Sequence, residues 1–360
     1  MTLVLKTDPV NPDPHILREA AGILKKGGIV AFPTETVYGL GAIVYNEEAV
    51  KKIFWAKMRP MDNPLIIHIS SIDMLEEVAV NIPEKAYRLI ERFWPGPLTL
   101  ILPRNPQIPK IVTSGLDYVA VRMPAHPVAL GLIREAGAPI AAPSANIAGK
   151  PSPTSAEHVI KDLYGRIDAV IDAGETIYGV ESTIINILTQ PPILLRPGAY
   201  AVEDIERVLG EKIHIPEFAR GFKEAETALA PGMKYKHYAP STPLILIETD
   251  ESSIEDIVKT TRSIALNYVS EGKEVCIVAS RETSSGYRDL NVRVLVIGSR
   301  SNLFEVARNL FKTLRELDEL KCSIAIIEGF EERGLGLAVM NRLRKAAEKK
   351  IHVYRSVMSP

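Results

Sequence analysis

The stretch GIVAFPTETVYGLG, residues 28–41, decides how the first half of the chain folds. Its apolar start has the length and composition of a buried strand, which then ends in two threonines, a glutamate and a tyrosine. In open α/β sheets the carboxyl ends of strands are where ligands bind, and Pro33 and Gly39 are typical of a loop of fixed shape. The alternative is that Thr34 or Thr36 caps a short helix. This segment alone leaves both interpretations open.

Outward from this stretch, helical and strand patterns interleave as far as about residue 215. Such interleaving predicts an α/β domain with a twisted mixed sheet. The expected helices cover residues 13–26, 47–57, 83–94 and 155–164, and the expected strands cover 28–32, 64–69, 98–102, 118–122, 169–174, 182–187 and 192–196.

The chain beyond residue 243 has a simpler alternation of short apolar strands and helices. The pattern predicts a smaller, Rossmann-like doubly wound domain. Its expected strands are LILIE (244–248), SIALN (263–267), EVCIVAS (274–280), VRVLVIG (292–298) and SIAIIEG (323–329). We therefore expect a first domain over 1–215, a linker over 216–242 and a second domain over 243–360.

Bulk composition excludes several classes of protein. The formal net charge of -1 and the pI near 6.7 give no global positive field for nucleic acid. No apolar run reaches the roughly 20 residues that span a bilayer, and the N-terminus lacks a signal-peptide pattern, so we expect a cytoplasmic protein without membrane contact. Cys276 and Cys322 lie at or beside apolar strand-like runs, which predicts two buried thiols and neither a zinc site nor a disulfide.

A cationic group of residues occurs in AKMRPMDNPLIIHIS, residues 56–70. Lys57 and Arg59 fall at a helix end, and an extended residue before Pro60 would let the two cations point the same way, as a phosphate site requires. His68 lies on the following strand, opposite an apolar stripe, and Asn63 precedes it. A single histidine on a strand is more often structural.

A second group follows the strand-like run at 138–142, in PSANIAGKPSPTS. Ser144, Asn146 and Ser152 place hydroxyls and an amide beside exposed N–H groups at a strand end and a helix start, which suits an anion. A well-capped turn is the alternative. Neither GxxxxGK[ST] nor GxGxxG occurs, which disfavours a Walker-type or Rossmann nucleotide site.

Three more polar residues stand where strands start or end. They are Arg122 in YVAVRMP, Ser182 in VESTI and Arg196 in LLRPG. Single arginines of this kind are usually surface ion pairs. Three polar residues at strand ends or starts, in motifs that contain Gly or Pro, favour a shared site.

The segment PGMKYKHYAP, residues 231–240, is rich in aromatic and basic residues. A passive tether would consist mostly of Gly, Ser and charged residues. We predict a lid in which Tyr235 and His237 approach the site of the first domain; a linker lying on the surface is the alternative.

Eight motifs in order carry a resemblance to a known family. They are FPTETVYGLG, the Lys-x-Arg-Pro with NPL and a strand histidine, WPGPLTLIL, AVRMP, APSAN, GKPSPTS, GVESTI and LLRPG. Over about residues 15 to 200 the chain resembles the threonylcarbamoyl-adenylate synthase family, the YrdC-like domain, in its two-domain form. The resemblance implies a nucleotidyltransferase that makes threonylcarbamoyl-AMP and pyrophosphate from ATP, L-threonine and bicarbonate or CO2, for N6-threonylcarbamoyladenosine in tRNA.

The resemblance also implies roles for the residues singled out above. Lys57 and Arg59 would stabilise the triphosphate as the catalytic pair. The threonine pocket would consist of Thr36, His68, Arg122 and Ser182, and the ATP site would add Asn63, Ser144, Asn146, Ser152 and Arg196. Mg²⁺ would arrive with ATP, held mainly by phosphates, since no carboxylate cluster resembles a protein metal site.

Two alternatives to this function stay open at the sequence level. One is a carbamoyl-adenylate-forming carbamoyltransferase, although such chains carry zinc-binding cysteines and an acylphosphatase-like segment that this chain lacks. The other is an RNA-binding module, which the near-neutral charge disfavours. The product would pass to the tRNA threonylcarbamoyl transferase machinery; whether tRNA itself is bound is left open.

Overall fold

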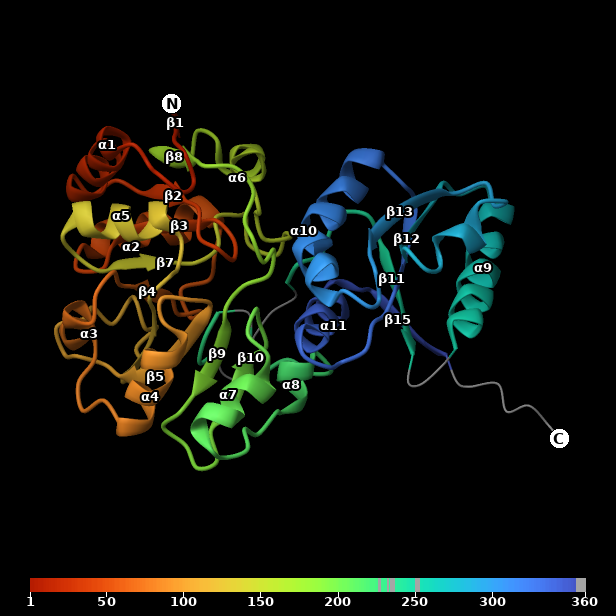
Figure 1. The fold of residues 1–360 in the computed structure, drawn as a ribbon. Helices are drawn as coiled ribbons and strands as arrows, with labels where there is room; N and C mark the ends of the chain where they lie inside the picture. The colour runs from red at the N-terminus through yellow and green to blue at the C-terminus, as the bar shows by residue number, and fades with distance from the viewer. Residues whose placement is uncertain (226–227, 232, 234–236, 250–252, 354–360) are drawn as a thin grey trace. The chain divides into compact units, whose positions relative to one another are not determined.

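The computed structural model describes residues 1–225, 228–231, 233, 237–249 and 253–353 (Figure 1). The chain divides into two compact units. The first comprises Met1–Ala148 and Ser152–Tyr235, and the second comprises Gly149–Pro151 and Lys236–Pro360.

The first unit contains a ten-stranded mixed sheet, as the interleaved pattern predicts. Its strand order is β1-β8-β2-β3-β7-β4-β6-β5-β9-β10. The strands are β1 (Leu3–Lys6), β2 (Val30–Phe32), β3 (Gly39–Ile43), β4 (Ile66–His68), β5 (Leu98–Pro103), β6 (Tyr118–Arg122), β7 (Ile140–Ala142), β8 (Ala169–Asp172), β9 (Thr183–Asn186) and β10 (Ile193–Arg196).

The helices of the first unit begin and end at local signals in the sequence. Helix α1 starts because the Asp13 carboxylate accepts the N–H of His15, with Pro14 at the first helical position, and it ends just before Gly27, whose φ is 78°. The helices are α1 (Pro14–Lys25), α2 (Glu47–Lys57), α3 (Asp73–Val78), α4 (Glu84–Phe93), α5 (Pro127–Ala136), α6 (Ala156–Leu163), α7 (Val202–Leu209) and α8 (Glu217–Arg220).

Helices α1 and α5 pack together against β2, β7 and β8, and their apolar residues form one core of the first unit (Figure 1). Leu17, Leu24, Leu132 and Ile133 are fully or almost fully buried in it. This core supports the strands from which the polar loops of the candidate site emerge.

One face of the sheet carries both apolar and polar residues in a regular arrangement. Side chains two positions apart on a strand share a face, so Ile66 shares its face with His68, and Ala120 with Arg122. The parallel register places these pairs beside each other, Ile66 opposite Ala120 and His68 opposite Arg122. The apolar residues of this face belong to a buried cluster, and the polar residues lie at the carboxyl ends of the strands.

The segment after residue 215 contributes to this same apolar cluster. Ala225, Ala230 and Met233 are buried against Ile66 and Ile184. The described residues of 216–233 therefore pack as part of the first unit, whereas the sequence placed the domain boundary at 215. The local reason is burial: Ala and Met at these positions cover apolar side chains that the sheet leaves uncovered.

The second unit contains a five-stranded parallel sheet in the order β13-β12-β14-β11-β15. Figure 1 shows α9 on one side of this sheet and α10 and α11 on the other, which is a doubly wound arrangement. Its elements are β11 (Leu244–Thr249), α9 (Ile254–Ser270), β12 (Val275–Ser280), the 3-10 helix η1 (Ser284–Tyr287), β13 (Arg293–Gly298), α10 (Leu303–Leu320), β14 (Ile324–Glu328), α11 (Leu335–Ala346) and β15 (Lys349–Val353).

One predicted strand of the second unit is wrong. The SIALN segment, 263–267, lies inside α9, and the fifth strand is β15, a segment for which no strand was expected. Short apolar runs fit a strand and a buried helical turn equally well. Helix α9 starts at a capping box formed by Ser253 and Asp256 and meets no Gly or Pro before Gly272, so it continues through the run.

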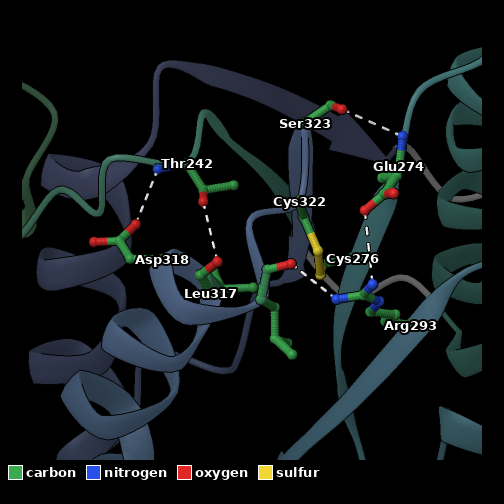
Figure 2. The surroundings of a disulfide bond; sticks show 9 residues. Thr242, Glu274, Cys276, Arg293, Leu317, Asp318, Cys322 and Ser323 are labelled. Carbon is green, nitrogen blue, oxygen red and sulfur yellow. Dashed lines mark hydrogen bonds and ion pairs between the residues drawn. A yellow bond between two sulfur atoms is a disulfide. The ribbon is translucent and has the colours of Figure 1, made fainter.

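The prediction of two separate thiols is also wrong. Cys276 and Cys322 form a disulfide, and their Cα atoms are 5.9 Å apart (Figure 2). The strands β12 and β14 are neighbours in the sheet, with Cys276 opposite Ala325, so Cys322, two positions before β14 begins, lies close to Cys276 on β12. The sequence did not reveal this pairing because the two cysteines are 46 positions apart in the chain and only the strand order brings them together.

Within the part of the chain that the structure describes, no helix has the length and apolar character needed to cross a membrane.

Candidate active site

The loop at residues 33–38 connects β2 to β3, which pair antiparallel. The Thr34 hydroxyl donates to the Val37 carbonyl (2.7 Å) and lies 2.7 Å from the Thr36 hydroxyl. Since its own proton is used, Thr34 accepts from Thr36. No helix follows this loop, so the helix-cap interpretation is excluded. The hydroxyls instead form a buried hydrogen-bonded chain at a strand end.

Arg122 ends β6 and joins three separate segments. Its Nη1 donates to the Thr36 hydroxyl at 2.9 Å, and its Nε donates to the Gly96 carbonyl at 3.2 Å. Its Nη2 lies 2.6 Å from Oε1 of Glu35, and the two side chains are only 4% and 3% exposed. A buried ion pair therefore occupies the place where the sequence predicted the threonine pocket. Sequence reasoning missed Glu35, although it stands between the two threonines.

His68 lies beside Arg122 in the register of β4 and β6. Burial, followed by the positive charge of Arg122, lowers the pKa of His68 from its ordinary 6.5 to about 3. Its Nδ1 is buried without a hydrogen-bond partner in the described structure. The imidazole is thus neutral at physiological pH and has an unused hydrogen-bonding nitrogen.

Ser182 and Arg196 meet where β9 begins and β10 ends. Nε and Nη2 of Arg196 donate to the Ser182 carbonyl at 3.2 and 3.1 Å, and Nη2 lies 3.2 Å from the Ser182 hydroxyl. Nη1 of Arg196 donates to the Pro231 carbonyl at 3.3 Å. The Ser182 hydroxyl also lies 2.8 Å from that of Thr99, a residue that sequence reasoning missed. Arg196 thus links Ser182, just before β9, to Pro231 in the segment 228–231.

The two cations of the Lys-x-Arg motif contact different segments. Nζ of Lys57 donates to the carbonyls of Ser144 and Asn146. Arg59 donates to the carbonyls of Asn63 (3.2 Å) and residue 64 (3.0 Å). Met58 between them has a φ of 53°, the left-handed conformation that ends α2. This left-handed turn stands between the two cations in the chain.

The loop after β7 lies against the loop after β2. The N–H of Ala145 donates to the Tyr38 carbonyl at 2.8 Å, and Ser144 pairs with Gly39 in a short bridge. Asn146 Nδ2 donates to the Ile147 carbonyl at 2.8 Å. Two polar loops from sequence positions about a hundred residues apart thus meet beside the Lys57 ammonium.

Two further predicted residues are buried in the first unit. Asn63 is 1% exposed, and its Oδ1 has no hydrogen-bond partner in the described structure. The Ser152 hydroxyl donates to Oε1 of Glu181 at 2.7 Å. Glu181 was missed by sequence reasoning, although it directly precedes Ser182 in the VESTI motif.

The predicted lid residues are placed only in part. Tyr235 lies outside the described residues. His237 belongs to the second unit, where its ring lies 5.5 Å from that of Tyr238, and Tyr238 stacks on Phe311 at 5.2 Å.

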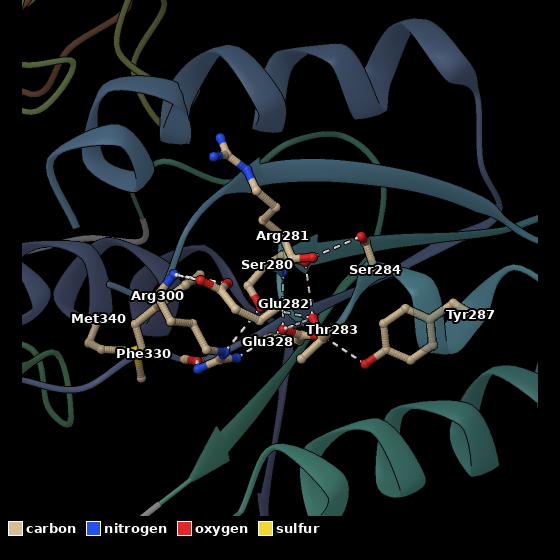
Figure 3. Close-up of polar contacts among 11 residues, drawn as sticks. Ser280, Arg281, Glu282, Thr283, Ser284, Tyr287, Arg300, Glu328, Phe330 and Met340 are labelled. Carbon is tan, nitrogen blue, oxygen red and sulfur yellow. Dashed lines mark hydrogen bonds and ion pairs between the residues drawn. The ribbon is translucent and has the colours of Figure 1, made fainter. Parts of the chain in front are cut away.

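The strand ends of the second unit carry a different polar network, centred on the buried carboxylate of Glu328 (Figure 3). It accepts from Tyr287 (2.6 Å), Thr283 (2.8 Å), Arg300 (2.8 Å) and the N–H of Ser280 (3.2 Å). Burial and the Glu328 carboxylate raise the pKa of Tyr287, so the phenol keeps its proton and donates it. Both Glu328 oxygens are satisfied within the unit, which is typical of a structural network.

Comparisons with known proteins cover almost the whole chain. A family described as "Telomere recombination" matches residues 22–198, and "Threonylcarbamoyl-AMP synthase, C-terminal domain" matches residues 200–348. The chain is 52% identical to a threonylcarbamoyl-AMP synthase of Pyrococcus abyssi over 93% of this chain and 95% of that protein. It is 47% identical to that of Bacillus subtilis over 96% of each.

A solved structure is similar throughout. The crystal structure of P. abyssi Sua5 complexed with L-threonine superposes with a TM-score of 0.91 at 50% identity, covering 98% of this chain and 100% of that chain.

Proposed function

The chain belongs to the threonylcarbamoyl-AMP synthase family in its two-domain form, and we infer that it makes threonylcarbamoyl-AMP and pyrophosphate from L-threonine, bicarbonate or CO2, and ATP. The observation that carries this conclusion is the similarity to named synthases over both units at 47–52% identity. The product serves N6-threonylcarbamoyladenosine formation in tRNA.

The proposed reaction requires little covalent chemistry from the side chains of the protein. Carboxylation of the threonine amine gives a carbamate, whose oxygen attacks the α-phosphate of ATP, and the bond to pyrophosphate breaks. Catalysis then consists of positioning the reactants and stabilising phosphate charge. Lys57 and Arg59 would supply that positive charge. In support, the Lys57 ammonium lies beside the junction of two strand-end loops, where it donates to the carbonyls of Ser144 and Asn146.

The nucleotide would lie along the loops that surround Lys57. The side chains proposed to contact it are Asn63, Ser144, Asn146, Ser152 and Arg196. Support comes from the buried, unsatisfied Oδ1 of Asn63, which a ligand donor would satisfy.

We propose that threonine binds on the adjoining strand ends. Arg122 would hold the carboxylate, since a guanidinium has five N–H donors and only three of its contacts are accounted for above. Thr36 and Ser182 would contribute hydroxyls. The neutral His68 can exchange a hydrogen bond with the threonine hydroxyl without adding a second positive charge to the pocket.

Mg²⁺ would enter with ATP. Among the described residues no group of three or more His, Cys, Asp or Glu side chains could hold a metal ion. Phosphate oxygens and water are the ligands that Mg²⁺ commonly keeps in such sites, so we propose a metal carried by the nucleotide. We also propose that the product is handed to the tRNA threonylcarbamoyl transferase machinery.

A mass-spectrometric assay tests this function. The full chain is incubated with ATP, Mg²⁺, L-threonine and bicarbonate, and with each substrate omitted in turn. An AMP adduct with the mass of threonylcarbamoyl-AMP, present only in the complete mixture, is the expected result. An adduct that forms without threonine would instead indicate carbamoyl-adenylate chemistry.

A further inference from the structure

Glu35 is a buried residue of the first unit whose carboxylate the proposed mechanism does not use. Its side chain is buried, and its Oε1 is within ion-pair distance of Arg122 Nη2. Neither carboxylate oxygen has a hydrogen bond of good geometry in the described structure. A buried carboxylate can accept about four hydrogen bonds, so this one has acceptor capacity that the protein leaves unfilled.

Glu328, in the second unit, is a buried carboxylate whose two oxygens both accept hydrogen bonds. Glu328 accepts from three side chains and one backbone N–H. Burying an acceptor without a partner costs free energy, and native proteins rarely leave one so unless a ligand or water completes it. The unfilled oxygens of Glu35 therefore point to a ligand that brings N–H or O–H donors.

The charges around Glu35 indicate the chemical class of the ligand. Glu35 and Arg122 form a neutral pair, and His68 beside Arg122 is uncharged. An α-amino acid carries its ammonium and its carboxylate on the same carbon, so a receptor needs an anion and a cation side by side. Glu35 and Arg122 supply that arrangement, 2.6 Å apart, with no net charge left to compensate.

We propose that Glu35 binds the ammonium group of L-threonine while Arg122 binds its carboxylate. This rests on the proposed function, and it assigns to Glu35 the selection of an amino acid over an uncharged or purely anionic analogue. Oε2 shares its carbon with Oε1, so it can receive an N–H of the ammonium while Oε1 stays at Arg122. The two contacts would fix the amine before its carboxylation.

Two ligands that differ only at the ammonium test the assignment. They are L-threonine and the 2,3-dihydroxybutanoic acid of the same stereochemistry, in which a hydroxyl replaces the ammonium. Binding of each to the full chain is measured by calorimetry for wild type, Glu35→Gln and a control, Glu206→Gln. Glu206 lies in α7, where it pairs with Lys212, and its loss also removes one negative charge from the first unit.

We expect wild type to prefer threonine strongly and Glu35→Gln to bind it at least about 30-fold more weakly, as when one partner of a buried charge pair is removed. The dihydroxy acid should bind Glu35→Gln as well as wild type or better, because Arg122 then lacks a competing anion. Glu206→Gln should keep the wild-type preference.

Equal weakening of both ligands would mean that Glu35 only orients Arg122, and unchanged threonine binding would remove it from the pocket; either outcome overturns the proposal. If Glu35→Gln does not fold, the wild-type ratio decides: equal affinity for the two ligands overturns it. Glu35→Asp, which keeps the charge but draws it back by one methylene, should show a smaller loss than Gln. Wild type that binds neither ligand would instead reject the proposed function.

Discussion

Buried polar atoms with unused hydrogen-bonding capacity are the residue-scale feature of the first unit. Glu35, Asn63 and His68 each retain such an atom, and all three lie in or beside the strand-end loops. In a folded protein each of these atoms carries a desolvation cost. Oε1 of Glu248 in the second unit is such an atom too. The candidate site is therefore marked by the position of Glu35 and His68 beside Arg122, and not by the number of such atoms.

Removing either cation of the Lys-x-Arg motif should abolish most activity. We expect Lys57→Ala and Arg59→Ala each to lower product formation about 10²-fold or more at saturating ATP, because a preorganised positive charge facing the phosphates is lost. The mass-spectrometric assay measures this.

Lys52→Ala is the matched control for these two variants. Lys52 lies on the same helix and donates to the Gly27 carbonyl at 2.7 Å, so its removal costs a lysine–carbonyl hydrogen bond away from the site. Its turnover should stay close to wild type. Wild-type turnover in Lys57→Ala or Arg59→Ala would remove that residue from the catalytic site.

His68 should make the chain sensitive to mild acid. Its folded pKa is about 3, against 6.5 when unfolded, so between these values the unfolded state takes up a proton that the folded state does not. The contribution of neutral His68 to the free energy of unfolding is therefore complete above pH 6.5. It is lost as the pH falls toward 3, by up to about 1.4 kcal/mol per pH unit. His68→Gln should lack this contribution.

Urea unfolding at pH 7.5, 6.5 and 5.5 checks this prediction. Burial also lowers the pKa of His126, but that effect is common to both proteins and cancels in the comparison. Identical losses in wild type and His68→Gln would show that folded His68 can accept a proton.

At the scale of elements, the site depends on strands that approach closely. A Cβ on Gly198 would lie 2.3 Å from the Ser182 carbonyl carbon and 2.3 Å from the Thr183 nitrogen, both backbone atoms. Gly198 follows β10, so this contact sets how near the end of β10 comes to the start of β9. No side chain can be accommodated there without moving Ser182.

Gly198→Ala should therefore damage both stability and the site. Overpacking of this kind costs typically about 1–3 kcal/mol, and the displaced Ser182 should raise the KM for threonine. The control is Gly22→Ala in α1, where the added Cβ meets no atom within 4 Å. A helical Gly→Ala change should stabilise by roughly 0.5–1 kcal/mol and leave KM unchanged. A Gly198→Ala chain with wild-type KM would show that Ser182 is not in the pocket.

For the whole molecule, the position of the domain boundary matters. Because Ala225, Ala230 and Met233 cover Ile66 and Ile184, a fragment cut at residue 215 loses part of the core of its own unit. We expect the fragment 1–215 to be about 2–5 kcal/mol less stable than the fragment 1–235, from the lost apolar burial. Urea unfolding of the two fragments gives the comparison, and equal stability would show that residues 216–235 are only a linker.

The predicted lid is tested on the full chain by limited proteolysis. Cleavage within 231–240 should slow markedly when threonine and an ATP analogue are both bound, since a closed segment is protected. In support, Ala230 and Met233 pack in the apolar cluster on the sheet face that also carries His68 and Arg122. The Pro231 carbonyl accepts a hydrogen bond from Arg196. Cleavage at the same rate with and without ligands would leave the segment a tether.

Local sequence signals were sufficient to predict many of the helices and strands of this protein and its family. The expected bounds of helices α1 and α2 agree closely with those observed, apolar runs marked most strands, and eight ordered motifs indicated the family. These features depend on residues near one another in the chain, so they can be recognised without knowing the fold. The same reasoning failed at 263–267, where a strand and a helical turn have the same local pattern.

The tertiary structure alone decided which residues meet. The Glu35–Arg122 ion pair, the neutral state of His68 and the Cys276–Cys322 disulfide each require neighbouring strands whose order no local pattern specifies. The physical reason is that burial and electrostatic interaction act through space. A carboxylate between two threonines in the sequence acquires its role only when β6 places a guanidinium beside it.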